Sequence, residues 1–193
     1  MPFKSIALSL VTALTLGFGV SAQATVYTST NVPVTICDVC DVSSSLAITS
    51  HSTITDLNVL LNNLTHTWDG DLLISLIAPN STTVVLSNRR GSSGDNFIGT
   101  VFDDEASTAV GNSAAPFTGA LNAEELLSVF DGMDAFGTWT LRVQDLASAD
   151  VGSINSWGLN ITSTTQNVPE PGSLALMGLG LAGLAATRRR KSV

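Results

Sequence analysis

The sequence predicts an all-β protein whose strands form an antiparallel sandwich or barrel. Between the two ends of the chain, short apolar runs alternate with period two and are separated by Gly, Asn, Asp, Ser and Pro. No stretch with a helical period competes with these runs. The central part, about 145 residues long once two predicted terminal segments are set aside, suits one domain with one hydrophobic core.

The N-terminal segment, residues 1–24, is predicted to be a secretory signal peptide. Lys4 supplies a positive start, residues 6–20 are apolar, and Ala22-Gln23-Ala24 is a cleavage site of the A-x-A type. We expect cleavage after Ala24 and export from the cytoplasm. The alternative, a buried first helix, would leave the charged start and the small-residue tripeptide unexplained.

The central part begins near two cysteines, Cys37 and Cys40, which are the only cysteines of the chain. Their spacing alone is compatible with a redox pair or a metal-binding pair. A zinc-ribbon site needs a second pair, and no thioredoxin-like alternation of strands and helices surrounds this one. Because export implies an oxidising compartment, we expect a short local disulfide between Cys37 and Cys40.

Three segments are the clearest strands, because apolar and polar side chains alternate along each of them. Trp139 and Trp157 lie on the apolar faces of the second and third, and we expect both in the core rather than against a ligand. Gly70 and Gly152 are expected at turns that need a positive φ. The three segments are 56–62, 138–144 and 157–162.

Two further elements are predicted between these strands. Residues 72–78 are apolar almost without interruption, which favours a central strand covered on both sides, and a Pro79-Asn80-Ser81 turn joins it to a second strand at 82–86. This pair is therefore a predicted hairpin. One short helical turn is expected at 122–126, where Asn122 is placed to cap it and two glutamates follow at its start.

The C-terminal end contains three segments of different composition. Residues 164–173 are a linker with the box Val168-Pro169-Glu170-Pro171, whose prolines exclude a helix and leave the backbone extended and accessible. Residues 174–187 are predicted to form a hydrophobic anchor helix, which is marginal because a comfortable span takes about 20 residues. Residues 188–193 carry four cations, which predicts a basic cytoplasmic tail.

This order of box, short apolar helix and basic cluster resembles the PEP-CTERM sorting signal of Gram-negative bacteria. The resemblance covers only the last 26 residues. It implies that the membrane enzyme exosortase is a processing partner that acts near Pro169, Glu170 and Pro171. The inner-membrane anchor would then be transient, and the protein would reach the cell surface or the exopolysaccharide matrix. A permanent single-span anchor is the alternative.

Removal of both ends would leave a strongly acidic domain. Residues 25–169 contain 15 carboxylates and three arginines, a formal difference of −12. Such a surface repels the phosphates of nucleic acids and anionic lipid head groups. Nucleic acid is therefore excluded as a partner, whereas cations and neutral partners are favoured.

Motifs in both halves of the central part carry a second resemblance. The sequence HTWDGDL at 66–72 precedes an apolar strand that ends in APN, and GTWTLRVQD at 137–145 is followed by DVGSI at 150–154 and WGLNI at 157–161. These motifs closely resemble the P domain (P/Homo B domain) of kexin- and furin-like subtilisin proteases. The resemblance implies a domain over residues 25–163 that is a jelly-roll β-sandwich of the galactose-binding-like type.

In that family the domain follows a subtilisin-type catalytic domain and supports its folding, stability and calcium dependence. Catalysis of that class needs an Asp, a His and a Ser brought together with an oxyanion hole. The only histidines are His51 and His66, and no G-x-S-x-G elbow accompanies them. We expect no catalytic residue and no peptidase activity in this chain, and we expect His66 to be a hydrogen-bonded structural side chain.

Carboxylates also collect at the predicted turns, and calcium prefers carboxylate and loop carbonyl oxygens. Together with the resemblance, this predicts calcium as a cofactor, held by a set of four carboxylates. The alternative is a solvated acidic surface, because no EF-hand spacing occurs. The predicted metal residues are Asp71, Asp95, Asp103 and Asp104.

Two functions are compatible with these features. The first is a non-catalytic surface or matrix module that binds an unknown protein or polysaccharide partner. The second is an accessory domain that stabilises a separately encoded subtilisin-like endopeptidase. An enzyme in its own right is disfavoured, because no nucleophile with an adjacent base, zinc triad or phosphate loop is found.

Overall fold

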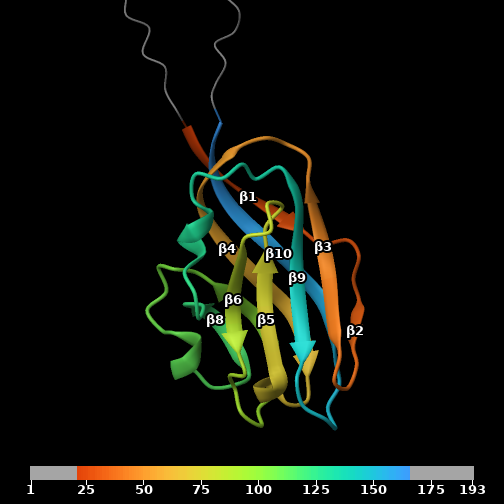
Figure 1. Cartoon of the computed structure of the whole chain (residues 1–193). Helices are drawn as coiled ribbons and strands as arrows, with labels where there is room; N and C mark the ends of the chain where they lie inside the picture. The colour runs from red at the N-terminus through yellow and green to blue at the C-terminus, as the bar shows by residue number, and fades with distance from the viewer. Residues whose placement is uncertain (1–20, 166–193) are drawn as a thin grey trace, which may run out of the picture. The chain divides into compact units, whose positions relative to one another are not determined.

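The computed structural model describes residues 21–165, which form two β-sheets packed as a sandwich (Figure 1). Most of the predicted signal peptide, the PEP box, the anchor helix at 174–187 and the basic tail at 188–193 lie outside the described residues. The strands are β1 (Ser21–Thr28), β2 (Val34–Ile36), β3 (Asp41–Ile48), β4 (Thr53–His66), β5 (Leu72–Ile77), β6 (Thr83–Asn88), β7 (Phe97–Phe102), β8 (Phe117–Leu121), β9 (Gly137–Asp145) and β10 (Gly152–Thr165).

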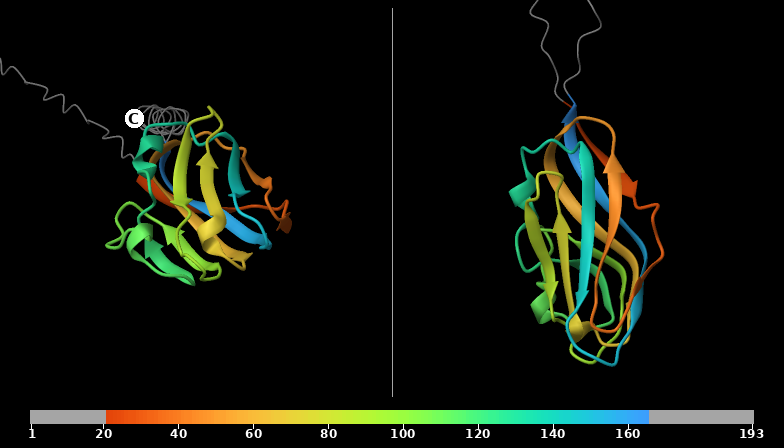
Figure 2. Two further views of the ribbon diagram at one scale, coloured as in Figure 1. Left: turned by 60° about the horizontal axis from the view of Figure 1, so that its bottom comes forward. Right: turned by 45° about the vertical axis from the view of Figure 1, so that its right-hand side comes forward.

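The larger sheet has the strand order β1-β10-β4-β7-β8, and β2 also pairs with β10. The smaller sheet has the order β3-β9-β5-β6. Figure 2 shows the two sheets facing each other across the core. The predicted all-β sandwich is therefore confirmed and a closed barrel is not formed. The pairing is antiparallel in β3–β9, β9–β5, β5–β6 and β10–β4, but β7 and β8 are parallel.

Large apolar side chains from both sheets fill the space between them. Trp139 on β9 and Trp157 on β10 are both 0% exposed, as predicted. Each indole N–H has a partner, since Trp139 Nε1 donates to the Ala135 carbonyl at 2.9 Å and Trp157 Nε1 donates to Ser44 Oγ at 2.7 Å. The two largest core side chains are thus buried without an unpaired donor.

The predicted hairpin is present as β5 and β6, and β5 lies between β9 and β6 in its sheet. The inward side chains Leu72, Ile74 and Leu76 are 0% exposed. Leu73 and Ile77 are only half-buried, because their face points away from the core. The prediction of a central strand is confirmed. Only one face of the strand is fully buried, however, whereas burial of both faces was predicted.

The predicted helical turn at 122–126 is wrong. Asn122 belongs to an isolated β-bridge with Ala109, and the backbone N–H groups of Glu124 and Glu125 donate to carbonyls of β6 at 3.1 Å. These donors satisfy the open edge of the smaller sheet, so they are not available for a helix. The 3₁₀ helices of the described part are η1 (Asp69–Asp71), η2 (Val110–Asn112) and η3 (Leu127–Phe130).

The expectation of positive φ at Gly70 and Gly152 is also wrong, because neither residue has one. Both positions need glycine for a different reason, which is close backbone approach. A Cβ on Gly70 would lie 2.8 Å from the Ser92 carbonyl oxygen, and a Cβ on Gly152 would overlap the Thr65 carbonyl oxygen of β4.

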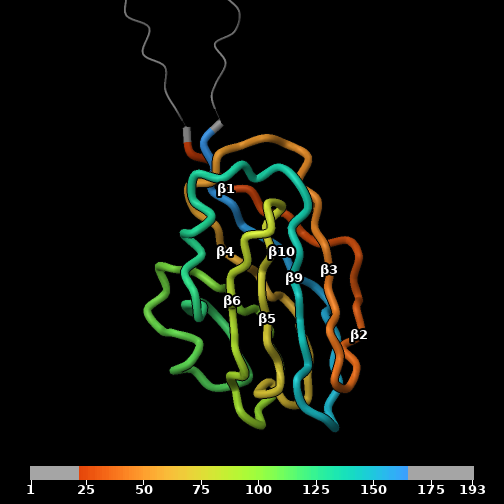
Figure 3. The backbone as a smooth tube through the Cα atoms, in the orientation of Figure 1, coloured from red at the N-terminus to blue at the C-terminus, as the bar shows by residue number. Residues whose placement is uncertain are grey.

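Both ends of the described chain lie at the same end of the sandwich (Figure 3). β1 begins there at Ser21, so it includes the predicted cleavage tripeptide, and β10 finishes there with Thr164 paired to Thr53. The loop after β5 is at this end, whereas η1 is at the other. Between Ser21 and Thr165 no helix has the length and apolar character needed to cross a membrane.

Candidate functional site

Carboxylates from four loops gather at the end of the sandwich that is remote from the chain ends. The loops are β2–β3, β4–β5, β6–β7 and β9–β10, at the bottom of Figure 1. We call this surface the acidic end. Its carboxylates are Asp38, Asp69, Asp71, Asp95, Asp145 and Asp150.

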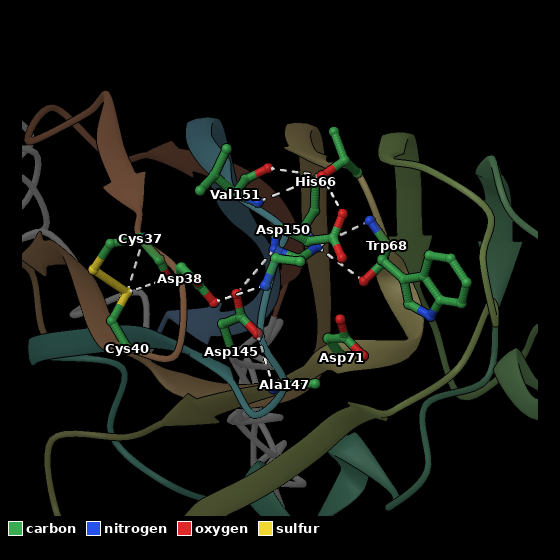
Figure 4. Close-up of polar contacts among 12 residues, drawn as sticks. Cys37, Asp38, Cys40, His66, Trp68, Asp71, Asp145, Ala147, Asp150 and Val151 are labelled. Carbon is green, nitrogen blue, oxygen red and sulfur yellow. Dashed lines mark hydrogen bonds and ion pairs between the residues drawn. A yellow bond between two sulfur atoms is a disulfide. The ribbon is translucent and has the colours of Figure 1, made fainter.

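A buried pair, His66 and Asp145, lies at the centre of the acidic end (Figure 4). His66 Nε2 is 3.3 Å from Asp145 Oδ2, and His66 Nδ1 is 2.9 Å from the Trp68 carbonyl oxygen. Both side chains are 0% exposed. Both ring nitrogens therefore have partners within the fold, and none of the hydrogen bonds to the ring comes from a hydroxyl or thiol of the described residues.

Two other aspartates tie the loops of the acidic end together. Thr67 Oγ1 donates to Asp150 Oδ1 at 2.7 Å, and the Ala149 N–H donates to Asp38 Oδ1 at 3.0 Å. Asp38 is held in its own loop by the disulfide between Cys37 and Cys40. These carboxylates therefore have structural partners.

The negative charge of Asp71 has little compensation from nearby positive groups. Asp71 is 6% exposed, and the nearest guanidinium nitrogen, Arg89 Nη2, is 4.0 Å from its Oδ1. Burial raises the pKa of Asp71 above its usual range, and the charges of Asp145 and Asp150 raise it further against the opposing effect of Arg89.

The Asp69 carboxylate is buried more completely than that of Asp71. It is 0% exposed, and among the described residues neither carboxylate oxygen has a hydrogen-bond partner of good geometry. Burial raises the pKa of Asp69 to about 7, with the Asp95 charge adding to the shift and the nearby Asn96 N–H opposing it. The loop from β6 to β7 covers this side chain, since the Asp69 N–H donates to the Gly94 carbonyl at 2.8 Å.

The four carboxylates predicted to hold calcium are divided between two places. Asp71 and Asp95 belong to the acidic end, whereas Asp103 and Asp104 follow the other end of β7. There Asp104 accepts hydrogen bonds from the N–H groups of Leu127 and Ser128 at 2.9 and 2.8 Å, and Asp103 Oδ1 accepts one from its own turn. Within residues 21–165 no three or more Asp, Glu, His or Cys side chains form a group that could hold a metal ion.

Apolar side chains are exposed beside the carboxylates of the acidic end. Trp68 in the β4–β5 loop is 43% exposed, and further exposed apolar side chains lie in the β2–β3 and β9–β10 loops. This combination of large apolar side chains and negative charge is typical of a binding surface. The other exposed apolar side chains of these loops are Val39, Leu146 and Val151.

Sequence reasoning did not select Asp69 or Asp145 as site residues. For Asp145 a signal existed, because the inward positions Trp139, Leu141 and Val143 of β9 continue to Asp145 with period two. His66 continues β4 inward from Leu64 in the same way. Asp69 lies in η1 and no periodic pattern reaches it.

Two family models match the chain. The first is the proprotein convertase P-domain, which matches residues 54–161. The second is a PEP-CTERM protein-sorting motif, which matches residues 167–191. Neither describes a catalytic domain.

Among the curated relatives, two of the three described here are named as proteases. A leupeptin-inactivating enzyme of Streptomyces exfoliatus is 38% identical over 95 residues, which is 49% of this chain and 16% of the relative. A transglutaminase-activating metalloprotease of Streptomyces mobaraensis is 32% identical over 50% of this chain and 10% of its own. A calcium-dependent protease of a Nostoc species is 34% identical over 58% of this chain and 14% of its own. The chain thus spans about a sixth of these relatives or less.

Among solved structures, the serine protease of Aeromonas sobria in complex with its chaperone contains a part with a similar fold. The likeness covers 76% of this chain and 27% of that one, with a TM-score of 0.50 and 22% sequence identity. At this identity the comparison supports the sandwich fold alone.

Proposed function

The chain belongs to the proprotein convertase P-domain family, and from this we propose that it is a non-catalytic module that binds a partner at the cell surface or in the extracellular matrix. Its PEP-CTERM motif implies export, anchoring in the envelope and processing by exosortase. In the relatives named as proteases the matched segment is a small part of the protein, and this chain carries that segment together with a sorting motif.

The acidic end is the observation on which this proposal rests. Its one histidine is buried and bonded within the fold, so it offers no accessible base. Its surface presents Trp68 and other apolar side chains among carboxylates. A partner that fits this surface is a protein or polysaccharide that is neutral or cationic, because an anionic one would be repelled.

The proposal is tested by binding to an outer-surface fraction. We expect the immobilised full chain to retain a component that Trp68→Ala retains at least fivefold less, while Leu126→Ala, which removes an exposed apolar side chain outside the acidic end, behaves as the wild type. Equal retention by both variants would contradict binding at the acidic end. Retention of a subtilisin-like protease whose stability depends on this chain would favour the accessory role instead.

We also propose that calcium binds at the acidic end. The buried carboxylate of Asp69 lacks partners among the described residues, and carboxylate oxygens of this kind suit a hard cation. Asp71 and Asp95 from the predicted set lie at the same end, but no ready group of three acidic or imidazole ligands accompanies them in the described part. Calcium would therefore need backbone oxygens and water as further ligands.

Calorimetric titration with calcium at pH 8 tests this part separately. The wild type should release or absorb heat, Asp69→Asn should not, and Asp103→Ala, at the far end of β7, should match the wild type. Absence of heat in all three would remove calcium from the proposal and would leave the surface module intact. Loss of heat only in Asp103→Ala would place the site elsewhere.

A further inference from the structure

A pocket lies at the other end of the sandwich, beside the end of β10. Its volume is about 390 Å³, within the range of small-molecule sites. The turn after β5 lines one side and the segment before β9 lines the other. The lining includes Pro79, Asn80, Met133, Asp134, Phe136 and Trp139.

Close packing between the two walls and hydrogen bonds within each wall hold the backbone that lines the pocket. Gly137 has a φ of +126°, and a Cβ there would lie 2.7 Å from Pro79 Cβ, so only glycine permits this approach. On the first wall, Asn80 Oδ1 accepts the Thr82 N–H at 3.0 Å. On the second, Asp134 Oδ1 accepts the N–H groups of Phe136 and Ser52 at 3.1 and 3.2 Å.

An exposed aromatic ring lies at the rim of this pocket. Phe136 is 45% exposed, and its ring is stacked on that of His51 with centroids 4.2 Å apart and planes inclined by 18°. The Nδ1 atom of His51 is in turn 2.6 Å from Asp134 Oδ2. An aromatic ring that is supported by stacking and remains open to solvent offers a flat apolar platform for the C–H face of a ring-shaped ligand.

Polar groups converge beside this platform. Asn80 Nδ2 donates to Met133 Sδ at 3.5 Å, and a thioether sulfur is a weak acceptor that a hydroxyl oxygen would outcompete. The Asp134 carboxylate is a strong acceptor, and the hydrogen bond from His51 lowers the pKa of Asp134, so it stays ionised. A donor, an ionised acceptor and an aromatic face therefore adjoin one cavity.

We infer that this pocket binds a neutral sugar ring of a polysaccharide. A pyranose offers an apolar C–H face for Phe136 and hydroxyl groups that both donate to Asp134 and accept from Asn80. An anionic sugar such as a uronate is disfavoured, because its carboxylate would approach Asp134 on a domain with a formal charge difference of −12. The inference deepens the proposed function and rests on it, since it names a polysaccharide as the partner class and assigns it a second surface.

The test is titration of the full chain with methyl glycosides of glucose, galactose and mannose, followed by NMR chemical shifts of the backbone amides. We expect shifts confined to residues around Asn80 and Phe136, at least a tenfold weaker affinity in Phe136→Ala, and no change in Ile98→Ala, an exposed apolar residue of β7. The methyl glycoside of glucuronic acid should bind at least tenfold more weakly than the neutral glycosides. Asp134→Asn, which keeps the acceptor for its two backbone N–H donors, should also weaken binding.

Several outcomes would overturn the inference while leaving the proposed function in place. One is the absence of shifts with every neutral glycoside, although Trp68 still mediates retention of a surface component. Another is equal binding of the glucuronide, or shifts confined to the acidic end. A third is binding of the peptide QNVPEPG, residues 166–172, at Phe136 when no glycoside binds there.

Discussion

Asp69 and Asp145 are both buried carboxylates of the acidic end, but only Asp145 has partners of good geometry. Asp145 is bonded to His66 and to the Ala147 N–H at 3.2 Å, whereas ionised Asp69 would be a buried charge without compensation. Proteins relieve such a charge by holding the proton, which is the physical meaning of the raised pKa of Asp69. The protonation of this single residue thus affects the stability of the whole domain.

Asp69 makes the free energy of unfolding fall as the pH rises. Its pKa is about 7 in the folded state and 3.8 when unperturbed, so between these values the folded state binds more protons. The Asp69 contribution is present below pH 4 and is lost as the pH rises through 7. It is on the order of 4 kcal/mol. We expect Asp69→Asn to flatten this slope in denaturant titrations with a calcium chelator present.

The control for this measurement is Ser93→Ala, which changes an exposed side chain without an ionisable group in the loop that covers Asp69. It should keep the wild-type slope. The difference between variants isolates Asp69 from the other carboxylates with altered pKa values, such as Asp71. An unchanged slope in Asp69→Asn would assign the pH dependence to those other groups.

Burial of single side chains was predictable wherever the alternation of inward and outward residues continued along a strand. Trp139 and Trp157 followed from alternation, and the same rule extended by one step would have placed Asp145 and His66 inside. Asp69 was not predictable in this way. It is covered by the β6–β7 loop, which passes through left-handed conformations at Arg89, Ser92 and Asn96, and no local pattern specifies that path.

At the scale of elements, the strands were predictable and the connections were not. Strands β4, β9 and β10 bury one face, so their hydrophobic pattern defines them. The segment around Glu124 has helical composition, but its N–H groups pair with the edge of β6, which is more than 30 residues away in sequence. A long-range hydrogen bond of this kind overrides local propensity.

The contact between β4 and β10 gives a prediction at this scale. A Cβ on Gly152 would overlap the Thr65 carbonyl oxygen of the neighbouring strand, and backbone cannot move aside as a side chain can. We expect Gly152→Ala to lower the free energy of unfolding by about 2 kcal/mol, measured from urea midpoints. Gly111→Ala is the matched control, because its Cβ would meet only the flexible Arg90 side chain, at 3.2 Å. Equal midpoints for the two variants would contradict the close approach.

At the scale of the molecule, the sandwich fold of the family is present, and the buried His66 makes its hydrogen bonds within that fold. We expect the full chain not to hydrolyse casein, measured by release of soluble peptides over hours. The physical reason is that His66 is hydrogen-bonded to Asp145 and to the Trp68 carbonyl, and no hydroxyl or thiol of the described residues hydrogen-bonds to its ring. Casein turnover that is abolished by His66→Ala would contradict this prediction.

Both described chain ends lie at one end of the sandwich and the acidic end lies at the other. The long strands β4 and β10 separate them by 14 residues each, or about 45 Å. The proposed binding surface at the acidic end and the inferred sugar pocket therefore lie at opposite ends of the same strands, so a domain that uses both would hold two partners about 45 Å apart.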